Sequence, residues 1–344
     1  MSTGNLLLFY SLKLKRLCIS GICLVFFRLA VASPAGTGGD FVFSPELVKA
    51  YSDIQKLRLE KARNILIEER GKKGENGFIP YLESYSDFFY FLVTDNQKDY
   101  AAFAKRQEAR LEQLAKLSGA SPYQRMMMAE IRLHSAFVKL KFGNRTSGSW
   151  DIIKANRLLG ENLKLFPEFV PHLKALGLLH VMIGSVPEDY QWVARMMGLR
   201  GTVRQGLAEL ATVEKESGLF GKEARVTALL LQPDERLIAK LKEMPYDEPD
   251  NLLFHFLSAS ILMKRSQGEA ALAILDKAPR SGEYVAFPFL HYMKAEVSLQ
   301  KRLYSKAATE YDHFLNQTRG INYLKDSYFK KFLCTWLDNG MKPQ

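Results

Sequence analysis

The six histidines are the side chains of this chain that could most directly hold a metal ion. No two of them stand three or four positions apart, the spacing at which one helix presents two ligands to one ion. The nearest two, His172 and His180, are eight positions apart, which is too far for a shared ion. We therefore interpret all six as ordinary surface or half-buried imidazoles: His134, His172, His180, His255, His291 and His313.

The common catalytic motifs are also missing from the sequence. It has no phosphate-binding Gly-x-x-x-x-Gly-Lys-Ser/Thr loop, no His-Glu-x-x-His and no Gly-x-Ser-x-Gly. Gly198-Leu199-Arg200-Gly201 indicates a tight turn between helices, since no strand precedes it. Many carboxylates are present, but no pair can be nominated as acid and base without a fold to join them. We predict no catalytic residue, no metal, no cofactor and no enzymatic activity.

The charge is distributed as on solvated helices. The formal charge of the whole chain is +11, and the four basic residues among the first 32 account for part of it, which leaves +7. The other Lys and Arg residues alternate with Asp and Glu, as in Arg58-Leu59-Glu60-Lys61. This pattern is typical of exposed helical faces, although an anionic partner surface stays open. No dense basic run or known motif indicates nucleic acid.

The first 32 residues have the pattern of a secretory signal. Lys13, Lys15 and Arg16 precede an apolar run, 17–27, and Ala30-Val31-Ala32 offers small residues for cleavage. We predict a signal peptide over 1–32, a flexible linker over 33–43 and an exported protein of the periplasm, cell envelope or exterior. Two alternatives remain: an uncleaved anchor, and an intracellular protein with a misleading N-terminus.

The sequence after the predicted signal peptide and linker indicates helices and no strands. Apolar residues recur at helical spacing, breaks come every 12–20 residues, and no sustained alternation indicates strands. Ser44 followed by Pro45 is a helix start. With two of the three cysteines in the signal, Cys334 is predicted to be a buried thiol. We predict a divergent array of helical hairpins over 44–245, further repeats over 246–344, and no membrane-spanning helix in the mature chain. Association with a membrane surface stays open.

The clearest repeat lies near the C-terminus. Ala295, Tyr304, Ala307, Tyr311 and Phe314 have the spacing at which small residues let two antiparallel helices approach and aromatic residues fill the space to the next pair.

A second copy precedes it, with Ser258, Ala270 and Ile274 at the corresponding positions. A third first helix begins at Asn322. Its second helix would start where the sequence given stops, so we expect this helix to be either a cap or a truncated repeat.

These repeats resemble the tetratricopeptide repeat family. The resemblance implies an all-α, right-handed α-solenoid of antiparallel helix pairs. A central segment, from Gly184 through Gly198 and Gly201 to Gly206-Leu207, is similar to the tetratricopeptide family of mitochondrial-surface proteins linked to inclusion-body clearance. Thr202 stands where that family has an aspartate. The second resemblance implies helical architecture and nothing about a pathway.

Solenoids hold peptides or partner helices on the inner curve formed by the first helices of each pair. We therefore predict a non-enzymatic scaffold that binds a protein or peptide, and the alternative is an envelope enzyme or small-molecule receptor with its site in the aromatic-rich 78–200 region. That region contains Tyr85, Phe88, Tyr90, Trp150, Tyr190 and Trp192. The residues predicted to line the groove are Leu252, His255, Ala259, Leu262, Phe289, Tyr292, Glu296 and Leu299.

Overall fold

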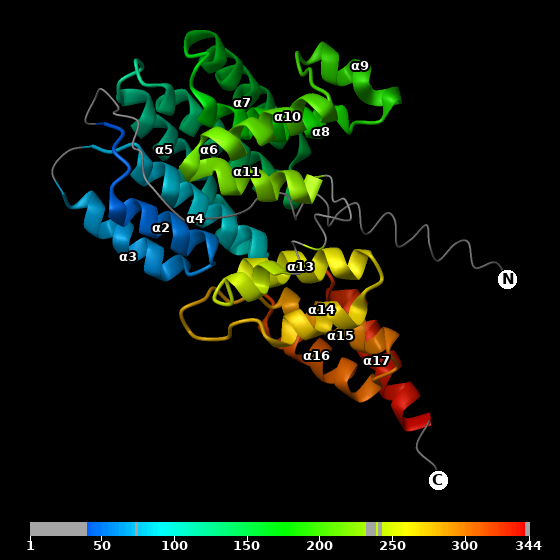
Figure 1. Ribbon diagram of the computed structural model, residues 1–344. Coiled ribbons are helices and arrows are strands. Elements are labelled where there is room, and N and C mark those ends of the chain that lie inside the picture. Colours follow the sequence, from blue (N-terminus) through cyan, green and yellow to red (C-terminus); the bar gives the residue numbers. More distant parts are fainter. Residues whose placement is uncertain (1–39, 73–74, 232–238, 240–242, 341–344) are drawn as a thin grey trace. The chain divides into compact units, whose positions relative to one another are not determined.

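A computed structural model describes residues 40–72, 75–231, 239 and 243–340. Figure 1 shows that helices account for all the regular structure in these residues, which contain no β-strand. The all-helical prediction is confirmed for this part of the chain. The predicted signal peptide, 1–32, and residues 33–39 of the predicted linker lie outside it.

Most of the described helices follow one another with short connections, while the longer segment 277–288 joins α14 to α15. Two short 3₁₀ helices, Gln97–Asp99 and Val170–His172, precede α5 and α8. None of the described helices combines the length and apolar character needed to cross a bilayer. The α-helices are α2 (Pro45–Gln55), α3 (Leu59–Arg70), α4 (Phe78–Thr94), α5 (Tyr100–Lys116), α6 (Pro122–Lys141), α7 (Arg145–Leu165), α8 (Leu173–Gly184), α9 (Glu188–Met196), α10 (Val203–Glu216), α11 (Gly218–Leu231), α13 (Leu252–Lys264), α14 (Gly268–Asp276), α15 (Phe289–Gln300), α16 (Tyr304–Gln317) and α17 (Leu324–Gly340).

The chain forms two compact units whose segments alternate along the sequence. The predicted division assigns all of 44–245 to one array, whereas 53–63 and 89–101 belong with the C-terminal helices. The first unit comprises the described parts of Met1–Ser52, Asn64–Phe88 and Ala102–Pro233, and the second comprises those of Asp53–Arg63, Phe89–Ala101 and Asp234–Gln344.

The last four residues of the predicted linker, 40–43, pack into the first unit. The ring of Phe43 lies 4.3 Å from that of Phe78, measured between centroids. The backbone carbonyl of Asp40 accepts a hydrogen bond from the N–H of Gly77 at 2.8 Å. Phe41 is buried and Phe43 is half-buried, which supplies a reason for this segment to join the core, since aromatic side chains remove large apolar areas from water.

Four helix pairs are joined by the same kind of turn. Leu57, Gly143, Ser266 and Arg302 each follow a helix with a positive φ, between 58° and 84°. In every case the next residue donates its N–H to the carbonyl five residues earlier, at 2.8–2.9 Å. This is the Schellman arrangement, which ends a helix and reverses the chain. The pairs α2/α3, α6/α7, α13/α14 and α15/α16 are therefore adjacent hairpins with a common connection.

This turn corrects the register of the predicted C-terminal repeat. Ser266 and Arg302 are 36 residues apart, so Ala259 matches Ala295, one residue later than the predicted Ser258. Likewise Ala271 and Leu275 take the positions assigned to Ala270 and Ile274. The corrected matches are fully buried in both copies: Ala259 and Ala295, Ala271 and Ala307, and Leu275 and Tyr311.

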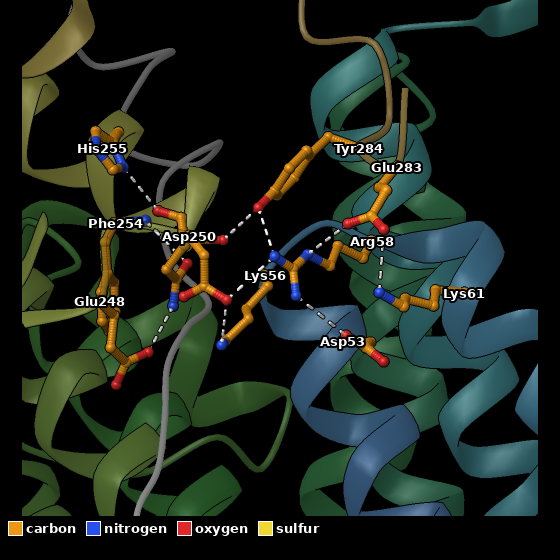
Figure 2. Close-up of polar contacts among 11 residues, drawn as sticks. Asp53, Lys56, Arg58, Lys61, Glu248, Asp250, Phe254, His255, Glu283 and Tyr284 are labelled. Carbon is orange, nitrogen blue, oxygen red and sulfur yellow. Dashed lines mark hydrogen bonds and ion pairs between the residues drawn. The ribbon is translucent and has the colours of Figure 1, made fainter. Parts of the chain in front are cut away.

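Within the second unit, Arg58 explains why the turn after α2 belongs with C-terminal residues (Figure 2). Its guanidinium donates to the Tyr284 hydroxyl at 2.8 Å and lies 3.1 Å from the carboxylate of Asp250. Lys56 contacts the same carboxylate at 2.7 Å. The N–H of Val285 donates to the carbonyl of Leu57 at 2.9 Å. Because these partners are some 190 residues or more apart in sequence, local periodicity could not reveal the contact.

Candidate functional site

The eight residues predicted to line a groove lie in the interior or at its edge. Phe289 and Leu299 are half-buried, so no side chain of the set is exposed. Binding of a partner at these two positions stays a prediction. The six buried members are Leu252, His255, Ala259, Leu262, Tyr292 and Glu296.

Tyr292 and Glu296, two of the polar members of the predicted groove, form hydrogen bonds within the second unit. The Tyr292 hydroxyl donates to Asp326 on α17 at 2.7 Å. Glu296 accepts from Tyr311 on α16 and from Lys330 on α17, both at 2.5 Å. Burial, with Glu296 and Asp326 nearby, raises the pKa of Tyr292, so it stays a neutral donor. These contacts join α15, α16 and α17, which is a structural role.

Among the described residues of the second unit, the outer face of α17 is the most aromatic exposed surface. Tyr328, Phe329, Phe332 and Trp336 are 62–68% exposed. Their spacing places them on one stripe of the helix, while Cys334, as predicted, is buried on the opposite side. At 150–250 Å² for a whole aromatic side chain, these exposures amount to roughly 500 Å². A patch of that size is near the upper limit for a monomer and indicates a binding surface.

An open cleft of about 620 Å³ adjoins this aromatic stripe, and Tyr328 belongs to both. Lys98 and Arg319 line the cleft, are exposed, and have no ion-pair partner among the described residues. Asp99, also in its lining, accepts hydrogen bonds from Tyr90 and Asn96 at 3.0 and 2.7 Å. Lys98 and Arg319 outnumber Asp99 in the lining, so the net charge of the cleft is positive, and it suits an acidic group on a partner that contacts the stripe.

The first unit contains a buried ionic cluster that sequence reasoning missed. The ammonium of Lys174 on α8 lies 3.0 Å from Glu130 on α6 and 2.9 Å from Glu223 on α11. Tyr81 donates to Glu130 at 2.7 Å, and Tyr85 donates to Glu223 at 2.9 Å. All three charged side chains are at most 7% exposed. No local signal could have identified the cluster, because its members come from separate helices.

The pKa values in this cluster are shifted by burial and by its uneven charge. Burial raises the pKa of the Glu130 carboxyl, and Lys174 opposes that shift. Burial alone would lower the pKa of Lys174, but the two carboxylates outweigh it and raise it. The neighbouring cavity is only about 30 Å³, the space of one water molecule. An enzyme or receptor was expected to have a deep pocket beside groups with shifted pKa values. This cavity lies beside such groups, but it is too small to hold a substrate or ligand.

The aromatic residues named for the 78–200 region divide into two groups. Tyr85 and Phe88 are buried on α4, and Tyr90 is half-buried. The remaining three are more than half exposed: Trp150 on α7, and Tyr190 and Trp192 on α9.

The histidines are mostly interior. His134, His172, His180 and His255 are buried. The rings of His291 and His313 lie 5.1 Å apart between α15 and α16, and Glu310 contacts His291 at 2.7 Å. Among the described residues, no group of three His, Cys, Asp or Glu side chains is placed to hold a metal ion.

Because His172 is buried, we expect the protein to lose a measurable amount of stability in acid. Its ring is fully buried, and the Asn162 amide donates to its Nδ1 at 3.3 Å. Burial lowers its pKa to about 4. The unfolded chain, with an ordinary histidine pKa near 6.5, therefore binds a proton that the folded chain does not. This contribution to the free energy of unfolding is complete above pH 6.5 and is lost as the pH falls towards 4.

The His172→Asn variant isolates this effect from other titrating groups. We expect its unfolding free energy, measured by urea denaturation from pH 7 to pH 4, to fall less steeply than that of the natural chain. The difference in slope approaches about 1.4 kcal/mol per pH unit, the value for one proton. Parallel curves for the two proteins would show that His172 takes up its proton at the same pH in the folded and the unfolded chain.

Comparison with protein-family models, with curated proteins and with solved structures found no match for this chain. The candidate site is therefore defined by geometry alone: the aromatic stripe of α17, formed by Tyr328, Phe329, Phe332 and Trp336, and the adjoining cationic cleft.

Proposed function

We propose that this chain is an exported, non-enzymatic scaffold that binds a helix of a partner protein on the aromatic stripe of α17. The observation that carries the proposal is the exposure of four aromatic side chains on one face of that helix. A right-handed α-solenoid of tetratricopeptide-like pairs is the architecture we propose to present it, and the hairpins with a common turn support this. The 1–32 signal pattern supports export.

The packing of α15 against α16 indicates which kind of partner would bind the aromatic stripe of α17. Tyr292 and Ala295 of α15 pack in one buried cluster with Ala307, Tyr311 and Phe314 of α16. The outer face of α17 has no such cover among the described residues. A partner helix with apolar residues three and four positions apart would take that place. Acidic residues at one end of the partner helix would lie near Lys98 and Arg319.

Site-specific photo-crosslinking in the native envelope tests this proposal. A photoreactive phenylalanine at Phe332 is expected to join a partner segment that has a helical apolar pattern and an acidic end. The same group at Thr309, exposed on α16, is the control and should not join it. Cross-links between two copies of α17 would instead show that the stripe binds a second copy of this protein. Mass spectrometry of the same sample should find the mature N-terminus at Ser33, and an intact Met1 would refute export by a cleaved signal.

The Phe332→Ser/Trp336→Ser variant is expected to lose the captured partner. Two central aromatic contacts each contribute more than about 1 kcal/mol to typical interfaces, so affinity should fall at least about thirtyfold. Folding should change by less than about 0.5 kcal/mol, because both side chains are exposed. Trp150→Ser is the matched control, because this tryptophan on α7 is 57% exposed and Trp336 is 64% exposed. If both variants captured the partner equally well, α17 would not be part of the interface.

The alternative, an envelope enzyme or receptor, has one supporting observation. The Lys174 cluster joins groups with raised pKa values beside a cavity in the first unit. A ligand there requires the cavity to expand well beyond the space of one water molecule. Ligand-induced protection of Glu130 or Glu223 from carboxyl-specific labelling would favour this alternative.

A further inference from the structure

Helix α9 of the first unit is packed unlike the other helices. None of its nine residues is buried, and Figure 1 shows it standing at the edge of the unit beyond α8 and α10. Isolated helices shorter than about 12 residues are marginal in water, so most helices of this length depend on a covered apolar face. The described residues of the chain cover α9 only in part, since Gln191, Val193 and Ala194 are half-buried and the other six residues are exposed.

Four of the exposed side chains of α9 and of the turn after it are aromatic or apolar. Met196 is 74% exposed, Tyr190 is 64% exposed and Trp192 is 55% exposed. Trp192 and Met196 stand four residues apart, so they lie side by side along the helix. Met197, in the turn, is 37% exposed. Tryptophan and tyrosine are the residues enriched where proteins meet the boundary between lipid and water.

The charges in and after α9 are divided between its two ends. Glu188 and Asp189 lie in the first turn, where the positive end of the helix dipole stabilises them. Arg195, Arg200 and Arg204 are at or beyond the other end and are exposed. None of the three has an ion-pair partner within the described part of the chain. Exposed arginines beside tryptophan and methionine match an anionic surface covered by apolar chains.

We propose that α9 and the turn that follows it, residues 188–204, attach this protein to the surface of a membrane that contains anionic lipids. Trp192 and Met196, which share one face of the helix, enter the boundary between headgroups and acyl chains, while Arg195, Arg200 and Arg204 contact lipid phosphates. The attachment is peripheral, since α9 is far too short to span a bilayer. It is independent of partner binding at α17, because it involves different helices in different units.

The three tryptophans of the chain make a direct test available. Trp150, Trp192 and Trp336 lie on α7, α9 and α17, and all are exposed. Variants that keep one tryptophan and carry phenylalanine at the other two are mixed with phosphatidylcholine vesicles, with or without phosphatidylglycerol, whose acyl chains carry bromine. We expect quenching of Trp192 fluorescence when phosphatidylglycerol is present, and none for Trp150 or Trp336. The chain starting at Ser33 is measured beside the full chain, because the apolar 17–27 run would itself bind vesicles.

Vesicle co-sedimentation measures the affinity. Each arginine near an anionic surface contributes about fivefold, so Arg195→Gln/Arg200→Gln should weaken binding about twenty-fivefold. Trp192→Ser/Met196→Ser should abolish binding, while the α17 variant Phe332→Ser/Trp336→Ser should bind as the natural chain does. Unquenched Trp192, or binding of the chain from Ser33 that survives the α9 substitutions, would overturn the proposal. Cross-linking of α9 to a protein, without binding to vesicles, would show that α9 binds a protein partner and not a lipid surface.

Discussion

Replacing Lys174 by methionine is expected to lower the free energy of unfolding by about 3–5 kcal/mol. Lys174 supplies the only positive charge among the buried charged side chains that contact Glu130 and Glu223 within the described residues. Without it, two carboxylates remain in the interior of the first unit with tyrosine hydroxyls as their donors. Removing one partner from a buried ion pair leaves an uncompensated charge, which is why the effect exceeds that of losing an exposed pair. Urea denaturation followed by circular dichroism measures it.

A triple variant distinguishes loss of charge balance from loss of packing. Lys174→Met/Glu130→Gln/Glu223→Gln removes all three charges and keeps side chains of similar volume. We expect it to recover at least half of the stability lost by Lys174→Met, because buried ion pairs can be replaced by neutral groups at little cost. A triple variant as unstable as the single one would show that Lys174 acts through its packing, which includes the Phe220 ring 4.9 Å from the ammonium.

The elements of the fold were predictable where the signal is local. Ser44 and Pro45 predicted the start of α2, and the Ser44 hydroxyl accepts a hydrogen bond from the N–H of Leu47 at 3.2 Å. The buried thiol of Cys334 was predicted because apolar residues surround it. The register of the C-terminal repeat was one residue off, because Ser266 and Arg302, neither of which is glycine, end their helices in a conformation that favours glycine.

The sites were less predictable because they depend on distant contacts. First-helix positions such as His255 and Tyr292 were assigned to an open groove, yet contacts with neighbouring helices bury them. A helix beginning at Asn322 was predicted, but its aromatic residues were not identified as a site, because only coordinates show which face of α17 stays uncovered. The Lys174 cluster joins residues 44 and 49 positions apart, and each residue alone looks like an ordinary charge on a helix.

The two faces proposed for binding differ in how the rest of the protein supports them. The α17 stripe is rigidly supported, since Tyr292 and Glu296 fix Asp326 and Lys330 on the same helix. Helix α9 has no buried residue and depends on the surface that it meets. A scaffold that attaches through α9 and binds through α17 would hold its partner at a membrane, and substitutions at one face should leave binding at the other unchanged.

Replacing Gly206 by alanine is expected to lower the free energy of unfolding by about 3 kcal/mol. A Cβ atom at Gly206 would lie 2.3 Å from the backbone carbonyl oxygen of Gly177, and one at Gly177 would lie 2.7 Å from that of Gly206. The backbones of α8 and α10 thus touch where these glycines face each other. A side chain can rotate away from a clash, but a backbone oxygen cannot, so the two helices must separate and lose contact along their length.

The control for this substitution is Gly160→Ala in α7. A Cβ atom there meets no atom within 4 Å, and alanine favours a helix interior over glycine by up to about 1 kcal/mol. We therefore expect Gly160→Ala to raise the unfolding free energy while Gly206→Ala lowers it, in the same urea experiment. The Gly206-Leu207 pair was singled out from sequence, but its reason lies in Gly177, 29 residues earlier and on another helix. If both alanine variants gained stability, α8 and α10 would have to be farther apart than the structure places them.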